Sequence, residues 1–319
     1  MTILVCTIDD YPTIARVMGC LQQQEGRERC ELLVLCPNAA TLNMPADVFE
    51  HFASGRVIEV GPVLRRGHSA AHGVRAATAP IVAFTEDHSF PEPGWILGHL
   101  KAHEGPYPAV SAMLLNQNPR SPISWADMLI GHGAITAPQK GGVVDRLGGH
   151  NISYKRDLLL QYFDHCLGDM LDTEPVHHEV WKRDGYQLYL SPDALVQHTN
   201  FESWSSWISS QYNHGQLYAA ARCKLWTKSQ RLRFLIVAPL SPVTRLLKLL
   251  HKTRVSGGEY RRVPGLALYI VFGITVSITG EIMGCFFGPG KAGLRLTPLE
   301  FHRHRHYVKR YHDKMGDYD

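Results

Sequence analysis

The first half of the chain alternates short apolar runs with segments of helical periodicity, and this alternation constrains the fold most. The runs predict strands at residues 3–8, 31–36, 57–60 and 81–85, with helices at 12–24, 42–53 and 68–78 between them. Strands that alternate with helices indicate βαβ units, and therefore an α/β fold whose parallel sheet is covered by helices. Ligands of such sheets bind beyond the carboxyl ends of the strands. The residues that directly follow these four strands are therefore the first candidates for a site.

The middle of the chain is less regular. It holds a strand-like run, a glycine-rich stretch, a charged helical segment, a predicted pair of strands and an aromatic helix, at residues 109–115, 131–149, 174–184, 186–196 and 201–226. We therefore expect the first domain to cover residues 1–226.

The last third is apolar and basic, and we predict a helical, membrane-associated region over residues 227–319. Residues 265–288 carry one charge, Glu281, and are longer than the ~20 residues that a spanning helix needs. A glutamate near the centre of a span costs about 2.5–3.5 kcal/mol on insertion scales. The segment can therefore be a single span, a hairpin in the membrane interface or a buried helix of the globular core.

Composition narrows the class of protein and its location. The chain is 45% hydrophobic and 19% charged, which excludes a disordered chain, and a net charge of +4 does not by itself indicate a nucleic-acid partner. The seven cysteines form no C-x-x-C pair, and the chain opens on a strand-like run instead of a signal peptide. We expect a protein at the cytoplasmic side of the cell membrane that binds no nucleic acid polymer.

The most informative chemistry follows the run at 81–85. Glu86, Asp87 and His88 lie at the predicted carboxyl end of this strand. Carboxylate and imidazole groups there can hold a divalent metal, and a bound metal can hold a diphosphate. The alternative is an ordinary polar turn.

Five segments, in order, resemble the inverting glycosyltransferases of family 2, which have a nucleotide-binding GT-A fold. They are the opening strand and turn VCTIDDYP (5–12), GVRAATAPIVAFTEDH (73–88) leading to the family's Asp-x-Asp metal motif, the acceptor-side GHNISYKR (149–156), the helix at 174–185, and the closing SPDALVQH (191–198). The resemblance covers residues 3–220 and implies transfer of a sugar from a nucleoside-diphosphate sugar to a hydroxyl of a polysaccharide or lipid-linked acceptor, with inversion.

The resemblance also implies roles for individual residues. Glu174 aligns as the catalytic base, with Asp172 and Glu179 as alternatives. The expected donor contacts are Thr7, Asp9, Asp10, Asn38 and Arg75, and the expected acceptor contacts are His150 and Asn151. The expected ligands of a divalent cofactor, Mn²⁺ or Mg²⁺, are Glu86, Asp87, His88 and His198.

Two departures from the family pattern leave alternatives open. The Asp-x-Asp motif is Glu-x-His here, and the family's base-reading aspartate falls at Cys36-Pro37-Asn38. A degenerate GT-A domain that only binds sugar nucleotides, or that acts as a scaffold, is therefore the alternative function. Nucleotidyl transfer is a weaker option, because residues 8–12 contain no glycine for a phosphate loop.

Overall fold

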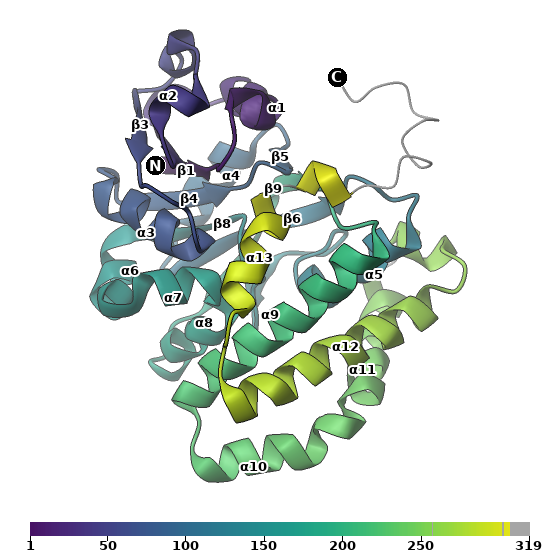
Figure 1. The fold of residues 1–319 in the computed structure, drawn as a ribbon. Helices are drawn as coiled ribbons and strands as arrows, with labels where there is room; N and C mark the ends of the chain where they lie inside the picture. Colours follow the sequence, from purple (N-terminus) through teal and green to yellow (C-terminus); the bar gives the residue numbers. More distant parts are fainter. Residues whose placement is uncertain (257, 302, 307–319) are drawn as a thin grey trace. The chain divides into compact units, whose positions relative to one another are not determined.

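Two units make up the computed structural model, which describes residues 1–256, 258–301 and 303–306 (Figure 1). The sheet unit comprises Met1–Leu115 and Gln139–His198. The helical unit comprises Asn116–Pro138 and the described part of Thr199–Asp319. This division follows from which residues pack together. The boundary that we expect after residue 226 separates a catalytic domain from a membrane-associated region, and it stays a prediction.

The sheet unit is built on one mixed sheet in the strand order β3-β2-β1-β4-β8-β6-β9-β5, with β7 paired to β9. Strands β1 to β4 run parallel, whereas β8 is antiparallel to both β4 and β6, and β9 is antiparallel to β5 and β7. The strands are β1 (Thr2–Cys6), β2 (Glu31–Cys36), β3 (Ser54–Glu59), β4 (Ile81–Thr85), β5 (Ser89–Pro91), β6 (Ala109–Asn116), β7 (Gly142–Val144), β8 (Ile152–Lys155) and β9 (Leu188–His198). The predicted α/β fold with a parallel sheet core is confirmed.

The helices of this unit are α1 (Tyr11–Gln22), α2 (Ala39–Leu42), α3 (Arg66–Ala76), α4 (Trp95–Ala102), α6 (Arg156–Phe163), α7 (Leu167–Asp172) and α8 (Glu174–Arg183). Every residue of β1 and β2 is buried, as expected for strands covered on both faces. Helix α3 packs closely on them because its residues are small, and a side chain at Gly73 would meet Leu35 and Leu4 at 3.0–3.1 Å.

Two elements differ from the sequence prediction. The helix expected at 42–53 is instead α2 followed by a 3-10 turn at Ala46–Phe49, because Asn43 adopts a left-handed φ of 48° and Pro45 follows it. The expected pair of strands at 186–196 is the single long strand β9. Strand β9 pairs with β7 along its first part and with β5 along its last part. Both partners are distant from β9 in the sequence, so local periodicity does not reveal these pairings.

The helical unit packs its helices around one apolar core. They are α5 (Pro122–His132), α9 (Trp204–Leu225), α10 (Lys228–Val237), α11 (Ser241–Ser256), α12 (Leu266–Phe287) and α13 (Ala292–Phe301). The core includes Trp125 of α5, Trp207 of α9, Ile274 of α12 and Leu296 of α13. Pro239 and Pro242 lie where α10 gives way to α11 through a 3-10 turn.

Helices α9 and α12 lie side by side with their backbones in close approach (Figure 1). A side chain at Gly215 of α9 would overlap the backbone at Ser277, and side chains at Gly280 and Gly284 of α12 would overlap the backbone at Tyr212 and Gln216. Glycine is therefore required along this contact for steric reasons.

The charge within α12 is paired. Glu281 is buried and binds Arg245 of α11 through two contacts of 2.7 and 2.9 Å and Arg222 of α9 at 2.8 Å. The carboxylate thus connects three helices of the unit.

Among the described residues, α12 is the one helix that is long and apolar enough to cross a membrane. Its most apolar window has a mean hydropathy of 1.8, and 39% of that window is buried inside the unit. Length and composition of this kind are weak evidence for a membrane location, because core helices share them.

Candidate functional site

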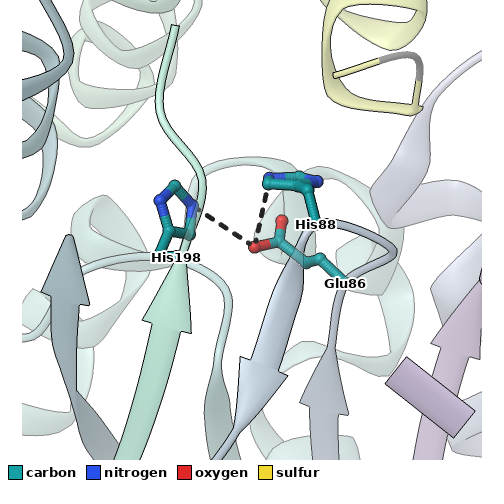
Figure 2. A group of neighbouring side chains, drawn as sticks. All are labelled: Glu86, His88 and His198. Atoms are coloured by element: carbon teal, nitrogen blue, oxygen red, sulfur yellow. Dashed lines mark ion pairs between the residues drawn. The ribbon is translucent and has the colours of Figure 1, made fainter. Parts of the chain in front are cut away.

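Pairing of strands brings Glu86, His88 and His198 together. Glu86 directly follows β4, and His88 precedes β5. Because β5 is antiparallel to β9 and Ser89 pairs with His198, the end of β9 lies beside the turn that carries the other two side chains. Figure 2 shows the three side chains directed toward one another.

The geometry of this group fits a divalent metal. Nε2 of His88 lies 3.7 Å and Nε2 of His198 lies 3.8 Å from Oε2 of Glu86 (Figure 2). One ligand atom from each residue lies within 4.8 Å of the others, and all three side chains are buried. One carboxylate and two imidazoles form a donor set suited to Mn²⁺ and softer divalent ions.

Neighbouring residues orient the three side chains. Oδ1 of Asp87 lies 2.7 Å from Nδ1 of His88, so Asp87 supports the histidine and leaves Nε2 toward Glu86. Asn151 and Ser89 donate to Oε2 of Glu86 at 3.0 and 3.2 Å.

His150 contacts the other carboxylate oxygen of Glu86 through Nδ1. Burial would raise the pKa of Glu86, but His150 and His88 together hold it well below its usual value. His150 and Asn151 both adopt left-handed backbone conformations, with φ of 64° and 40°. Such conformations are uncommon for non-glycine residues and are concentrated at functional sites.

Glu174 lies next to this group, at the start of α8. Its side chain is fully buried. Oε1 accepts a hydrogen bond from Nη2 of Arg66 at 3.1 Å and from the backbone N–H of His150 at 3.3 Å. Oε2 has no hydrogen-bond partner among the described residues. The carboxylate is therefore held through one oxygen, and the other can accept a proton.

Arg66 is the site residue that the sequence did not reveal. It is buried at the start of α3 and also donates to the carbonyl of Leu171. Burial opposes its charge, but Glu174 and then Glu86 raise the pKa of the guanidinium above its usual value. Its position shortly after β3, at the carboxyl edge of the sheet, is the signal that could have identified it.

Gly67 allows α3 to lie against α7. Its N–H donates to Oδ1 of Asp172 at 2.7 Å, and a side chain there would lie 2.6 Å from the backbone nitrogen of Asp172. Asp172 also binds Arg65 at 2.7 Å. Glu179, the other alternative base, is exposed on α8 and pairs with Lys182 at 3.2 Å. Of the three predicted carboxylates, Glu174 is the one that the structure brings beside Glu86 and His150.

The expected donor contacts lie near the ends of β1 and β2, with one exception. Oγ1 of Thr7 accepts from the N–H of Asp9, Asp10 accepts from Thr13, and Asn38 caps α2 by accepting from the N–H of Thr41. Asp9 and Asn38 follow neighbouring parallel strands and therefore lie at the same edge of the sheet.

Arg75 lies elsewhere. It is nine residues along α3 from Arg66, a distance of about 13 Å at 1.5 Å per residue. Its guanidinium is exposed and binds the side chain and carbonyl of Asp164, each at 2.9 Å.

Comparison with known proteins supports the fold. No protein-family model matches the sequence, and no curated protein matches it. The solved structure of mannosyltransferase PcManGT from Pyrobaculum calidifontis, in complex with GDP-Man and Mn²⁺, matches 89% of this chain and 86% of its own, with 15% identity and a TM-score of 0.60. The fold of this chain is thus that of the GT-A glycosyltransferases.

Two further solved structures match with TM-scores of 0.47. S. aureus TarS in complex with UDP-GlcNAc is 12% identical, over 88% of this chain and 90% of its own. GalNAc-T7 with UDP, GalNAc and Mn²⁺ is 9% identical, over 62% of this chain and 42% of its own. At this level of similarity they add no argument to the first match.

Proposed function

We propose that this chain is a glycosyltransferase that moves a sugar from a nucleoside-diphosphate sugar to a hydroxyl acceptor. The observation that carries the proposal is the state of Oε2 of Glu174, which is buried and has no hydrogen-bond partner among the described residues. The Glu174 side chain contacts His150, which in turn contacts Glu86. A carboxylate oxygen in this position can take the proton of an acceptor hydroxyl.

In the proposed reaction, the acceptor hydroxyl gives its proton to Oε2 of Glu174 while its oxygen attacks the anomeric carbon of the sugar. The bond between that carbon and the diphosphate oxygen breaks, and the nucleoside diphosphate leaves with the electron pair. Attack opposite the leaving group inverts the configuration, as the resemblance to family 2 implies. Arg66 and the N–H of His150 hold Oε1 and thereby orient the base.

Glu86, His88 and His198 would hold a divalent cation, Mn²⁺ or Mg²⁺, with Asp87 supporting His88. When bound, the cation neutralises the negative charge that develops on the diphosphate. The Mn²⁺ and GDP-Man in the complex of PcManGT support this part of the proposal.

For the nucleotide, we propose Thr7, Asp9, Asp10 and Asn38 as contacts, because they follow β1 and β2 at the carboxyl edge. Arg75 is left out, because Asp164 holds its guanidinium.

For the acceptor we propose a glycan or a lipid-linked molecule, with His150 and Asn151 on the acceptor side. Residues 1–226 would form the catalytic domain, and the region 227–319 would hold it at the cytoplasmic face of a membrane. The apolar helix α12 supports a membrane location only weakly, because length and composition alone distinguish it.

The test measures release of nucleoside diphosphate by the full chain from a panel of sugar nucleotides, with and without Mn²⁺. Glu174→Gln should lower release by about 10²- to 10⁴-fold, since general base catalysis contributes that much. Glu179→Gln is the matched control, because this glutamate is exposed on the same helix and pairs with Lys182. It should leave release unchanged.

Equal release by Glu174→Gln and wild type would remove Glu174 from the mechanism. Donor binding in calorimetry without any turnover would favour the alternative, a GT-A domain that only binds sugar nucleotides, which the altered Glu-x-His motif motivates. Failure to bind any donor would overturn both functions.

A further inference from the structure

The segment from α10 to α11 presents a row of large apolar side chains to the outside of the helical unit. They are 45–69% exposed and comprise Leu232, Ile236, Val237, Leu240, Val243 and Leu247, which we call the 232–247 apolar surface. Leu232 and Ile236 are four residues apart on α10, and Val243 and Leu247 are four apart on α11, so each pair shares one helical face. Apolar rows of this kind on a soluble protein mark a site of interaction.

The charges of the same segment are of one sign. Residues 228–256 contain seven lysines and arginines and no aspartate or glutamate. Lys228, Arg231, Arg233 and Lys248 are exposed next to the apolar row. Arg245 pairs with an acid, Glu281. A surface that combines exposed apolar side chains with exposed positive charge is complementary to an anionic lipid interface.

The pairing of Arg245 explains why the α11 part of the apolar row, Val243 and Leu247, faces outward. Arg245 is two residues from both Val243 and Leu247, which places it about 200° around the helix from each of them. Its two contacts with Glu281 turn this face of α11 toward α12 and leave the opposite face exposed. The close backbone contact between α9 and α12 keeps the supporting helices together.

We propose that the 232–247 apolar surface docks the protein in the plane of an anionic lipid bilayer. The apolar side chains would enter the boundary between headgroups and acyl chains, and the exposed lysines and arginines would contact anionic headgroups. This inference deepens the membrane location within the proposed function. It needs only the helical unit and does not depend on the transfer reaction.

The test is cosedimentation of the full chain with vesicles, without sugar nucleotide. One set contains phosphatidylcholine alone and the other contains phosphatidylcholine with about 30% phosphatidylserine. Wild type should bind the anionic vesicles more strongly, and added salt should weaken the binding, because salt screens the headgroup contacts.

The double variant Ile236→Gln/Leu247→Gln should weaken binding to anionic vesicles at least about tenfold, since two apolar side chains no longer leave water. Both side chains are exposed, so the fold does not need them. Leu64→Gln is the matched control, because Leu64 is 64% exposed on the sheet unit. It should bind as wild type does. Circular dichroism and thermal unfolding of all variants should coincide.

Several outcomes would overturn the proposal. Wild type that binds neither set of vesicles, or a double variant that binds as well as wild type, would show that this surface does not meet lipid. Equal binding to neutral and anionic vesicles would show that the lysines and arginines make no specific contacts with anionic headgroups. If wild type instead forms a dimer that the double variant dissociates, the surface is a contact between two copies of the chain. By contrast, loss of vesicle binding by the double variant with unchanged release of nucleoside diphosphate would support this surface independently of the catalytic proposal.

Discussion

Replacing Gly280 with alanine should force α9 and α12 apart. The added carbon would lie 2.9 Å from the carbonyl carbon of Tyr212, 3.1 Å from the nitrogen of Gln216, and nearer still to the carbonyl oxygen of Tyr212. Carbon and carbonyl oxygen ordinarily approach to about 3.3–3.6 Å. Because the obstacle is backbone, a side-chain rotation cannot relieve the overlap, and the two helices must move.

The cost follows from two opposed effects. Overpacking of a well-packed contact destabilises by about 1–3 kcal/mol. Alanine also favours a helix over glycine by about 1 kcal/mol. We therefore expect Gly280→Ala to lower the free energy of unfolding by up to about 2 kcal/mol.

Gly131→Ala is the same substitution at a position where the free energy of unfolding should rise instead of fall. Gly131 belongs to α5 of the same unit, and a side chain there would meet nothing within 4 Å. Only the gain in helix propensity remains, so this variant should be more stable than wild type by up to about 1 kcal/mol.

The assay is urea unfolding of the full chain, with hydrogen exchange of α9 and α12 as the local measurement. Gly280→Ala should lower the unfolding midpoint and speed exchange in both helices, whereas Gly131→Ala should not. A Gly280→Ala protein at least as stable as wild type would refute the close backbone contact. An equal loss of stability in both variants would mean that glycine is needed for a reason other than this contact.

Three further predictions concern single side chains. Burial raises the pKa of Asp127 from 3.8 to about 6, so the native state holds an extra proton at this residue between these values, and its contribution to the free energy of unfolding falls as pH rises from about 4 to 6. Asp127→Asn should remove this contribution, so between pH 4 and 6 the free energy of unfolding of the variant should change more positively with pH than that of wild type; equal slopes would contradict the raised pKa. Arg66→Lys should lower kcat much more than it changes KM for the donor, because lysine keeps the charge but lacks the terminal Nη2 that donates to both Leu171 and Glu174. Equal changes in both constants would count against an orienting role. His88→Asp should shift the metal preference toward Mg²⁺ in calorimetric titrations, because an oxygen ligand replaces an imidazole; an unchanged ratio of Mn²⁺ to Mg²⁺ affinity would exclude His88 as a ligand.

The sheet could be predicted because its strands are continuous apolar runs. Residues 31–36 and 81–85 lie in β2 and β4, as expected from their composition. The group of Glu86, His88 and His198 was also accessible, since the order of the motifs placed both segments at strand ends. The order of the motifs did not show that the two segments meet. The pairing of Ser89 with His198 in the structure brings His198 beside Glu86 and His88.

Other features depend on partners that no local pattern encodes. Arg66 looks like any arginine before a helix until Glu174 and Leu171, more than a hundred residues later, meet its guanidinium. Similarly, glycines in a helix predict only a weaker helix, whereas Gly280 and Gly284 are needed because the backbone of α9 lies against them. Such requirements arise from tertiary packing and can be read only when both partners are known.

Glu281 shows why composition alone could not decide how the apolar helix is used. In the sequence, an acid within residues 265–288 counts only as a cost of entering lipid. In the structure, Arg222 and Arg245 hold this carboxylate, and removing one partner of a buried ion pair typically costs about 3–5 kcal/mol. Inserting α12 alone would break both pairs and the backbone contact with α9. Membrane contact that preserves these interactions keeps α9, α11 and α12 packed together, and it therefore has to use their outer surface.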